Sequence, residues 1–256
     1  MNNELINEYN KLEIVDYITA NDSKNMENVQ GLVVFKNDKG EVIDIRKNLV
    51  LMEARIHLFN HLFQGKKVGS TSEITTYNEN LDRIICLFKI GSGGADVNGS
   101  PFTPYVPKFN DTDLGQPVPF IIQDPNKDST LEGRSNPSIV VTLNDEQKKT
   151  YFLEQTFEDG TTKYYGKIFE PSSTTWKLDK ALGKVAYSVT LRIEYNEARG
   201  FMFNELGLVL GKPLYDVDNT TIKNVTYPTL ASRVTFDTKP LTDLTSDLEI
   251  EYIIYI

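Results

Sequence analysis

Two histidines, His57 and His61, have the spacing in this sequence that most directly suggests metal chemistry. They stand at i and i+4 in a segment with helical periodicity, so both imidazoles would project from one side of a helix and could chelate zinc. The zinc-peptidase pattern also requires a glutamate directly after the first histidine, and Leu58 stands there instead. Without that base or an obvious third ligand, we interpret the pair as the polar side of a helix. We therefore predict no metal site.

The glycine-rich run Gly91-Ser92-Gly93-Gly94 follows an apolar strand pattern, as phosphate-binding loops do. A phosphate-binding loop continues with Gly-Lys-Ser/Thr, whereas this one continues with Ala95-Asp96, and the dinucleotide fingerprint lacks its last glycine. We interpret the run as a flexible exit from the strand. No cofactor is expected.

An acidic segment, with Asp111, Asp113 and Gly115, resembles the start of a calcium-binding loop. Such a loop needs glycine at position six and glutamate at position twelve. Counted from Asp111, those positions hold Gln116 and Ile122. We interpret the segment as a turn whose aspartates cap nearby backbone groups.

The remaining candidates for catalysis are equally incomplete. No Gly-x-Ser-x-Gly nucleophile motif occurs, and nothing selects one pair among the 36 acidic residues for glycoside hydrolysis. Cys86 lies among Ile, Leu and Phe, where a thiol is an inert small hydrophobe. The single tryptophan, Trp176, is interpreted as a core or interface residue. The prediction is that the chain is not an enzyme and has no catalytic residues.

The composition of the chain limits the classes of molecule that we expect it to bind. The formal net charge of −9 repels phosphate backbones, so the chain is not expected to bind nucleic acid. No apolar stretch reaches the roughly 20 residues of a membrane span, and the polar first residues do not form a signal peptide. We expect a soluble protein that is made in a reducing cytoplasm and does not contact a membrane.

The elements that would position these residues are mostly strands. One helix is predicted at about residues 51–64, where Met52, Ile56, Phe59 and Phe63 form an apolar stripe. Strands are expected over 31–35, 42–45 and 84–90, and again from residue 138 onward, where apolar and polar residues alternate over 185–195 and 248–256. Residues 201–210 are apolar on both faces, which predicts a central strand.

The predicted fold is therefore mainly β: a β-sandwich or open barrel of antiparallel strands with one conspicuous helix and long extended loops. We expect an N-terminal arm over residues 1–30, then a single β-rich domain over 31–256. A loop over 92–136 is inserted in that domain, and it is far longer than the median connection of about 4–6 residues.

Aromatic residues of this loop are predicted to contact partner proteins: Phe102, Tyr105, Phe109 and Phe120. Apolar side chains among prolines are plausible anchors in a neighbour's groove. The alternative is that the loop folds back and covers its own sheet.

Glu205 is the only charged residue in the apolar strand 201–210. A carboxylate buried without a partner costs several kcal/mol, so it must find a cation or hydrogen-bond donors. Arg233 lies in the strand expected nearby, and its guanidinium suits a carboxylate. A structural ion pair between Glu205 and Arg233 is predicted.

The strand Phe203–Leu208 contains N-E-x-G-L, the segment Arg233–Phe236 contains R-x-x-F, and an amphipathic strand closes the chain. These short motifs resemble a module of virion proteins in tailed bacteriophages. The first half is similar too, through Lys47-Asn48-Leu49-Val50, the glycine-rich run after residue 90, and Asp111-Thr112-Asp113-Leu114. The resemblance covers roughly residues 41–115 and 185–256, and it points to Glu205 and Arg233 as well.

The resemblance implies a structural part of the phage particle, in the tail or baseplate, or in the neck or collar. Its partners would be other virion proteins, including copies of itself, and it would act by protein–protein assembly. Two alternatives remain open. A receptor- or glycan-binding module at the tail tip should show an exposed aromatic cluster in a groove. A virion-associated hydrolase should show a cleft with convergent carboxylates of perturbed pKa.

Overall fold

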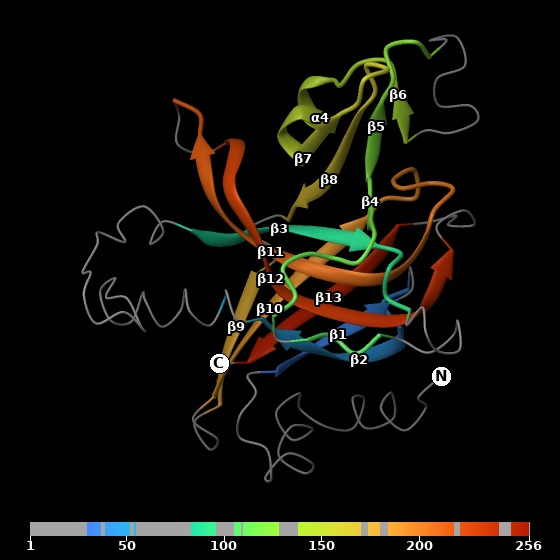
Figure 1. Cartoon of the computed structure of the whole chain (residues 1–256). Helices are drawn as coiled ribbons and strands as arrows, with labels where there is room; N and C mark the ends of the chain where they lie inside the picture. Colours follow the sequence, from blue (N-terminus) through green and yellow to red (C-terminus); the bar gives the residue numbers. More distant parts are fainter. Residues whose placement is uncertain are drawn as a thin grey trace. The chain divides into compact units, whose positions relative to one another are not determined.

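The computed structural model describes residues 30–36, 39–51, 54, 83–95, 105–108, 110–127, 138–169, 174–179, 184–217, 221–240 and 247–255 (Figure 1). Most of these residues lie in antiparallel strands, so the mainly-β fold predicted from the sequence is confirmed. Helix α4 spans Asp145–Thr150. The helix predicted near residues 51–64, with both histidines, lies outside the described residues except for Leu51 and the helical Ala54. The expected N-terminal arm lies outside them too, except for Gln30.

The chain divides into two compact units, where the sequence analysis expected one domain after residue 31. Unit 1 contains Met1–Val50, Phe169–Tyr195 and Leu244–Ile256, and unit 2 contains Leu51–Ile168 and Asn196–Asp243. Both units are assembled from segments far apart in the chain. The hydrophobic pattern predicts where strands lie but not which strands pair, so it gives no sign of this division.

Unit 1 is an antiparallel sheet. Its strand order is β2(Val42–Val50), β1(Gln30–Lys36), β13(Leu248–Tyr255), β10(Lys184–Ile193) and β9(Thr174–Asp179). The alternation predicted for β10 is confirmed, because Val189, Leu191 and Ile193 are buried while Thr190 and Arg192 are exposed. Tyr252 of β13 lies between Val33 of β1 and Val189 of β10, and all three side chains are buried.

Unit 2 contains the longer strands. Its order is β6(Ile139–Val140), β5(Ile121–Gln123), β8(Thr162–Ile168), β3(Ile84–Gly91), β11(Met202–Tyr215) and β12(Ile222–Pro240). In addition, β4(Pro117–Val118) pairs with β3, and β7(Tyr151–Thr156) pairs with β8. Strand β11 lies between β3 and β12 and is buried from Phe203 to Gly211, so the predicted central strand is confirmed.

Aromatic side chains fill the core of unit 2. Phe88 packs edge-on against Phe120 with ring centroids 5.1 Å apart, and Phe203 packs in the same way against Phe236 at 5.1 Å. The two pairs bring β3 together with the segment before β5, and β11 together with β12. Edge-to-face contacts of this kind add about 0.5–1.5 kcal/mol each beyond their buried area.

The described part of the predicted loop over 92–136 is not a free extended loop. It contains β4 and β5, and Leu114, Val118, Phe120 and Ile121 are buried. Strand β5 pairs with both β8 and β6. Strands of two or three residues are too short to show alternation, which explains why the sequence pattern missed them.

Candidate functional site

Glu205 lies at the centre of a buried polar network in unit 2. Its side chain is fully buried in β11, and its carboxylate accepts hydrogen bonds from three backbone amides. Gly93 N and Gln116 N donate to Oε1 at 2.9 and 3.0 Å, and Gly115 N donates to Oε2 at 3.0 Å. Bonds to an ionised acceptor are among the stronger ones in proteins, so these amides hold two separate segments against β11.

Arg233 is the remaining partner of the Glu205 carboxylate. Its Nη2 and Nε atoms donate to Glu205 Oε2 at 2.6 and 3.1 Å, which is the ion pair predicted from the sequence. In the register of β11 with β12, Arg233 lies opposite Gly207, two residues from Glu205 on the same face. The remaining guanidinium nitrogen, Nη1, pairs with Asp111 Oδ2 at 2.8 Å.

Tyr105 contacts the same guanidinium. The Arg233 guanidinium carbon lies 4.9 Å from the centre of the Tyr105 ring, within the range of a cation–π interaction. Tyr105 N donates to Gly94 O at 2.6 Å, and Thr235 Oγ1 donates to Tyr105 O. The segment around residue 105 is therefore fixed to the glycine run after β3 and to β12 of its own unit.

The glycines at the end of β3 and directly after it are required by close packing. A Cβ on Gly91 would lie 2.4 Å from Glu205 Oε1, one on Gly93 would lie 2.5 Å from Gln116 N, and one on Gly94 would lie 2.2 Å from Asn204 O. Gly94 N also donates to Asn204 Oδ1 at 2.7 Å. The interpretation of this run as a flexible exit was wrong, because its glycines allow the backbone to approach the buried carboxylate.

The carboxylates of the acidic segment, Asp111 and Asp113, already have partners within the protein. Asp111 accepts from Lys108 N at 3.0 Å as well as from Arg233, and Asp113 accepts from Leu114 N at 2.8 Å and pairs with Lys89. The aspartates thus cap backbone groups, as expected for a turn. Within the described residues, no group of three or more His, Cys, Asp or Glu side chains could hold a metal ion.

Four of the motifs that carried the sequence resemblance meet at this one place, whereas Lys47–Val50 and the closing strand belong to unit 1. The glycine run, the acidic segment, Glu205 and Arg233 are far apart in the chain, yet their contacts form a single network, which we call the Glu205 network. The charged side chains of this network form their hydrogen bonds and ion pairs with other groups of the same protein. Its chemistry is suited to fixing loops in place.

A second buried ion pair lies elsewhere in unit 2. Lys167 Nζ is 2.7 Å from Glu197 Oε1, both side chains are buried, and Tyr151 Oη donates to the same carboxylate. The neighbouring Ala198 adopts a positive φ of 49° and donates from its backbone to Phe120 O at 2.8 Å. The sequence analysis missed this pair, because Lys167 and Glu197 occupy strand and turn positions where charges are usually solvated.

The four aromatic residues that were predicted to contact partner proteins differ in where the structure places them. Phe120 is completely buried against Phe88 and Tyr151, so the prediction that it contacts a partner is wrong. Tyr105 is half-buried and contacts Arg233 within its own chain. Phe102 and Phe109 lie outside the described residues. Phe120 was misassigned because an aromatic residue in a proline-rich segment looks the same whether it anchors its own core or a neighbour's.

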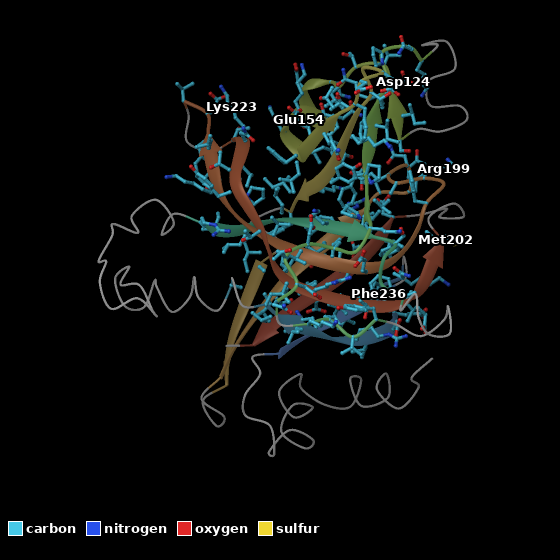
Figure 2. The ribbon with its side chains drawn as sticks, viewed as in Figure 1. Asp124, Glu154, Arg199, Met202, Lys223 and Phe236 are labelled. Atoms are coloured by element: carbon cyan, nitrogen blue, oxygen red, sulfur yellow. The ribbon has the colours of Figure 1, made fainter. Side chains whose placement is uncertain are left out.

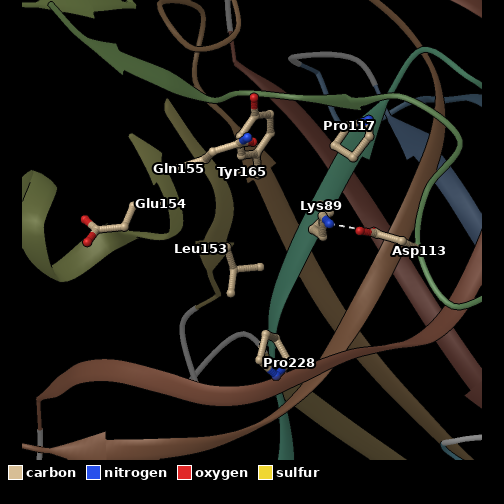
Figure 3. Close-up of a pocket in the computed structure, with 8 residues that line it drawn as sticks. All are labelled: Lys89, Asp113, Pro117, Leu153, Glu154, Gln155, Tyr165 and Pro228. Carbon is tan, nitrogen blue, oxygen red and sulfur yellow. Dashed lines mark hydrogen bonds and ion pairs between the residues drawn. The ribbon is translucent and has the colours of Figure 1, made fainter. Parts of the chain in front are cut away.

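A pocket of about 480 Å³ lies in unit 2 (Figure 3). Its walls come from five strands and from the segment before β4, and they combine apolar and charged side chains: Lys89, Asp113, Pro117, Leu153, Glu154, Gln155, Tyr165 and Pro228. Figure 3 shows Lys89 paired with Asp113 on one side, while Glu154 and Gln155 lie across from them. The backbone of Leu153 has a positive φ of 57°. A non-glycine residue rarely keeps this conformation unless the surrounding structure holds it there.

Cys86 is buried in β3, and burial raises the pKa of its thiol to about 12. The thiol is therefore protonated at neutral pH and lacks the thiolate that nucleophilic catalysis requires.

None of the helices within the described residues is both long and apolar enough to cross a membrane.

Comparisons with known proteins give no assignment: no family model, no curated protein and no solved structure matches this chain.

Proposed function

We propose that this chain is a structural component of a tailed-phage particle, in the tail or baseplate or in the neck or collar, and acts by protein–protein assembly. The observation that carries the proposal is the convergence of four of the resembling motifs in the Glu205 network: the glycine run, the acidic segment, and the strands of Glu205 and Arg233. Motifs that are scattered in sequence but joined in space share one structural task, and here that task is to fix two loops onto a central strand.

A structural role also fits how the polar groups of unit 2 are used. The carboxylates of Glu205 and Glu197 are each buried and paired with a cation, and Asp111 and Asp113 are each paired with one. A hydrolase needs a carboxyl group free to exchange a proton with substrate. In the pocket, the Asp113 carboxylate is engaged by Lys89.

The test is to locate the chain in particles of the phage that encodes it. Purified particles should contain the chain at a fixed number of copies by quantitative mass spectrometry, and antibody labelling in the electron microscope should mark the tail, baseplate or neck. A chain that is abundant in infected cells but absent from purified particles would overturn the proposal.

A further inference from the structure

The chain leaves unit 2 in the middle of the sequence and later returns to it. Unit 2 runs as far as Ile168, the last residue of β8, and resumes at Asn196, whereas Phe169–Tyr195 belong to unit 1. We call residues 169–195 the excursion; it contains β9 and β10. Along the chain, a separation of these two strands from their neighbours can reach unit 2 only at the two ends of the excursion.

A buried ion pair joins these two ends. Lys167 is the next-to-last residue before the chain leaves unit 2, and Glu197 is the second residue after it returns. Lys167 Nζ lies 2.7 Å from Glu197 Oε1 and 2.8 Å from Oε2, and the two side chains are only 8% and 3% exposed. Tyr151 Oη donates a hydrogen bond to the same carboxylate. The leaving and returning segments are therefore connected directly by their side chains.

The leaving end is part of the sheet of unit 2. Lys167 lies opposite Tyr151 of β7 on one side of β8 and opposite Phe88 of β3 on the other. Ile168 lies opposite Leu87 of β3. Within the described residues, β8 pairs with β3 at these two positions alone. Few backbone hydrogen bonds therefore hold the end of β8 to β3 when the chain beyond it is pulled away.

The returning end is a turn that precedes β11. Figure 2 shows Arg199 in this turn and Met202 at the start of β11. Ala198 has a positive φ of 49°, and its amide donates to Phe120 O at 2.8 Å. The amide of Phe120 donates in turn to Tyr164 O of β8 at 2.9 Å. The turn is therefore connected to β8 by a second route beside the ion pair.

A buried ion pair is suited to holding two segments at one fixed point. Compared with apolar side chains of similar shape it adds little net stability, but withdrawing one partner leaves the other charge buried without compensation, which is costly. If the returning chain moved away with Glu197, Lys167 would remain between β7 and β3 without its anion. The pair therefore resists the separation of these two ends in particular.

We propose that Lys167, Glu197 and Tyr151 form a clasp that stops openings of the excursion from spreading into the end of β8 and the turn after it. With the clasp closed, β10 can separate from β13 while these two segments of unit 2 stay in place. Proteins open in cooperative parts of unequal stability, and the clasp sets the boundary between two such parts. The inference does not depend on the phage assignment.

The test combines a weakened excursion with removal of the clasp in the full chain. Val189→Ala weakens β10, because the Val189 side chain is buried in the core of unit 1. Lys167→Met with Glu197→Gln removes both charges of the clasp while keeping side chains of similar size. Native-state hydrogen exchange then follows β10 through its own amides and unit 2 through the amides of Ala198 and Phe120.

With the clasp intact, Val189→Ala should increase exchange in β10 at least about tenfold and leave the amides of Ala198 and Phe120 unchanged. Without the clasp, the same substitution should also increase exchange at Ala198 and Phe120, again at least about tenfold. An ion pair that only stabilises unit 2 predicts a different result. Its removal would lower protection in unit 2 by the same factor whether residue 189 is valine or alanine.

Arg233→Met with Glu205→Gln is the matched control. It removes another buried ion pair of unit 2, but neither residue lies at an end of the excursion. In this background, Val189→Ala should leave the exchange of Ala198 and Phe120 unchanged. If the chain without the clasp does not fold, exchange of the wild-type chain in increasing urea replaces it. There the amides of β10 should open at lower urea concentration than those of Ala198 and Phe120.

Three results would refute the inference. The first is an effect of Val189→Ala on Ala198 or Phe120 while the clasp is intact. The second is the absence of any such effect once the clasp has been removed. The third is a single common opening of β10, Ala198 and Phe120 in the wild-type chain in urea.

Discussion

At the scale of single residues, the fully buried Glu205 illustrates how a charge is kept inside a β-sheet. It has one cation and three backbone amides as partners, and its cation, Arg233, has a second carboxylate in Asp111. Removing one member leaves another charge buried without compensation, which costs more than the pair contributes when intact.

Arg233→Met should therefore destabilise the protein by about 3–5 kcal/mol, because Glu205 and Asp111 lose their shared cation. The measurement is urea unfolding followed by circular dichroism. Lys148→Met is the control, since it breaks the exposed pair of Lys148 with Asp145 and should have little measurable effect. Equal losses in the two variants would contradict the buried role of Arg233.

The Cys86 thiol should not react with a thiol-specific reagent in the folded protein at pH 8. Burial raises its pKa from 9.0 to about 12, so the thiolate is scarce and the reagent has no access. In concentrated urea the same reagent should label one thiol per chain. Rapid labelling without urea would show that β3 opens readily.

The same pKa difference predicts a pH effect on stability. Between about pH 9 and 12 the unfolded chain loses the thiol proton while the folded chain keeps it, so this group's contribution to stability decreases as pH rises. The wild type should therefore lose more unfolding free energy from pH 8 to pH 10 than Cys86→Ala does. An equal loss in both would contradict the raised pKa.

At the scale of elements, the end of β3 depends on glycine for close approach. Gly94 contacts β11 through Asn204 on one side and Tyr105 on the other. The backbone at this point has no room for a methyl group. The segment after β3 is therefore a packed part of unit 2.

Gly94→Ala should destabilise the protein by about 2–3 kcal/mol, because the new Cβ would lie 2.2 Å from a backbone oxygen and the backbone must shift. Gly200→Ala is the comparison. Gly200 has open space around it but a φ of 90°, so alanine there should cost only about 1–2 kcal/mol of conformational strain. Thermal unfolding measures both. A larger loss at Gly200 would mean that the contact at Gly94 relaxes easily.

At the scale of the whole molecule, residues 110–123 are held by hydrogen bonds within their own chain. In unit 2, the amides of Gly115, Gln116, Phe120 and Ile122 all donate to acceptors of the same chain. The order of these residues therefore requires no partner.

Hydrogen exchange on the isolated chain, at a concentration where it is monomeric, should show strong protection at these four amides. Asn126 should exchange quickly by comparison, because its exposed amide donates only to the nearby Asp124 side chain. Protection that appears only in assembled particles would mean that a partner orders the segment.

The amino-acid sequence by itself determined the strands with clear patterns and one long-range contact. Alternation over 185–195 places Leu191 inward and Arg192 outward whatever the neighbouring strands are, because successive side chains point to opposite faces. A lone carboxylate in an apolar strand requires a partner, and the strand expected nearby together with the resemblance pointed to Arg233 as that partner.

Only the tertiary structure decided which segments meet. The glycines after β3 surround Glu205 because β3 pairs with β11 in one register, and no local pattern encodes a register between strands more than a hundred residues apart. The same holds for Phe120 and for Glu197 with Lys167, whose surroundings come from distant segments. Local periodicity specifies which face of a strand is buried, whereas the identity of the neighbour depends on packing over the whole unit.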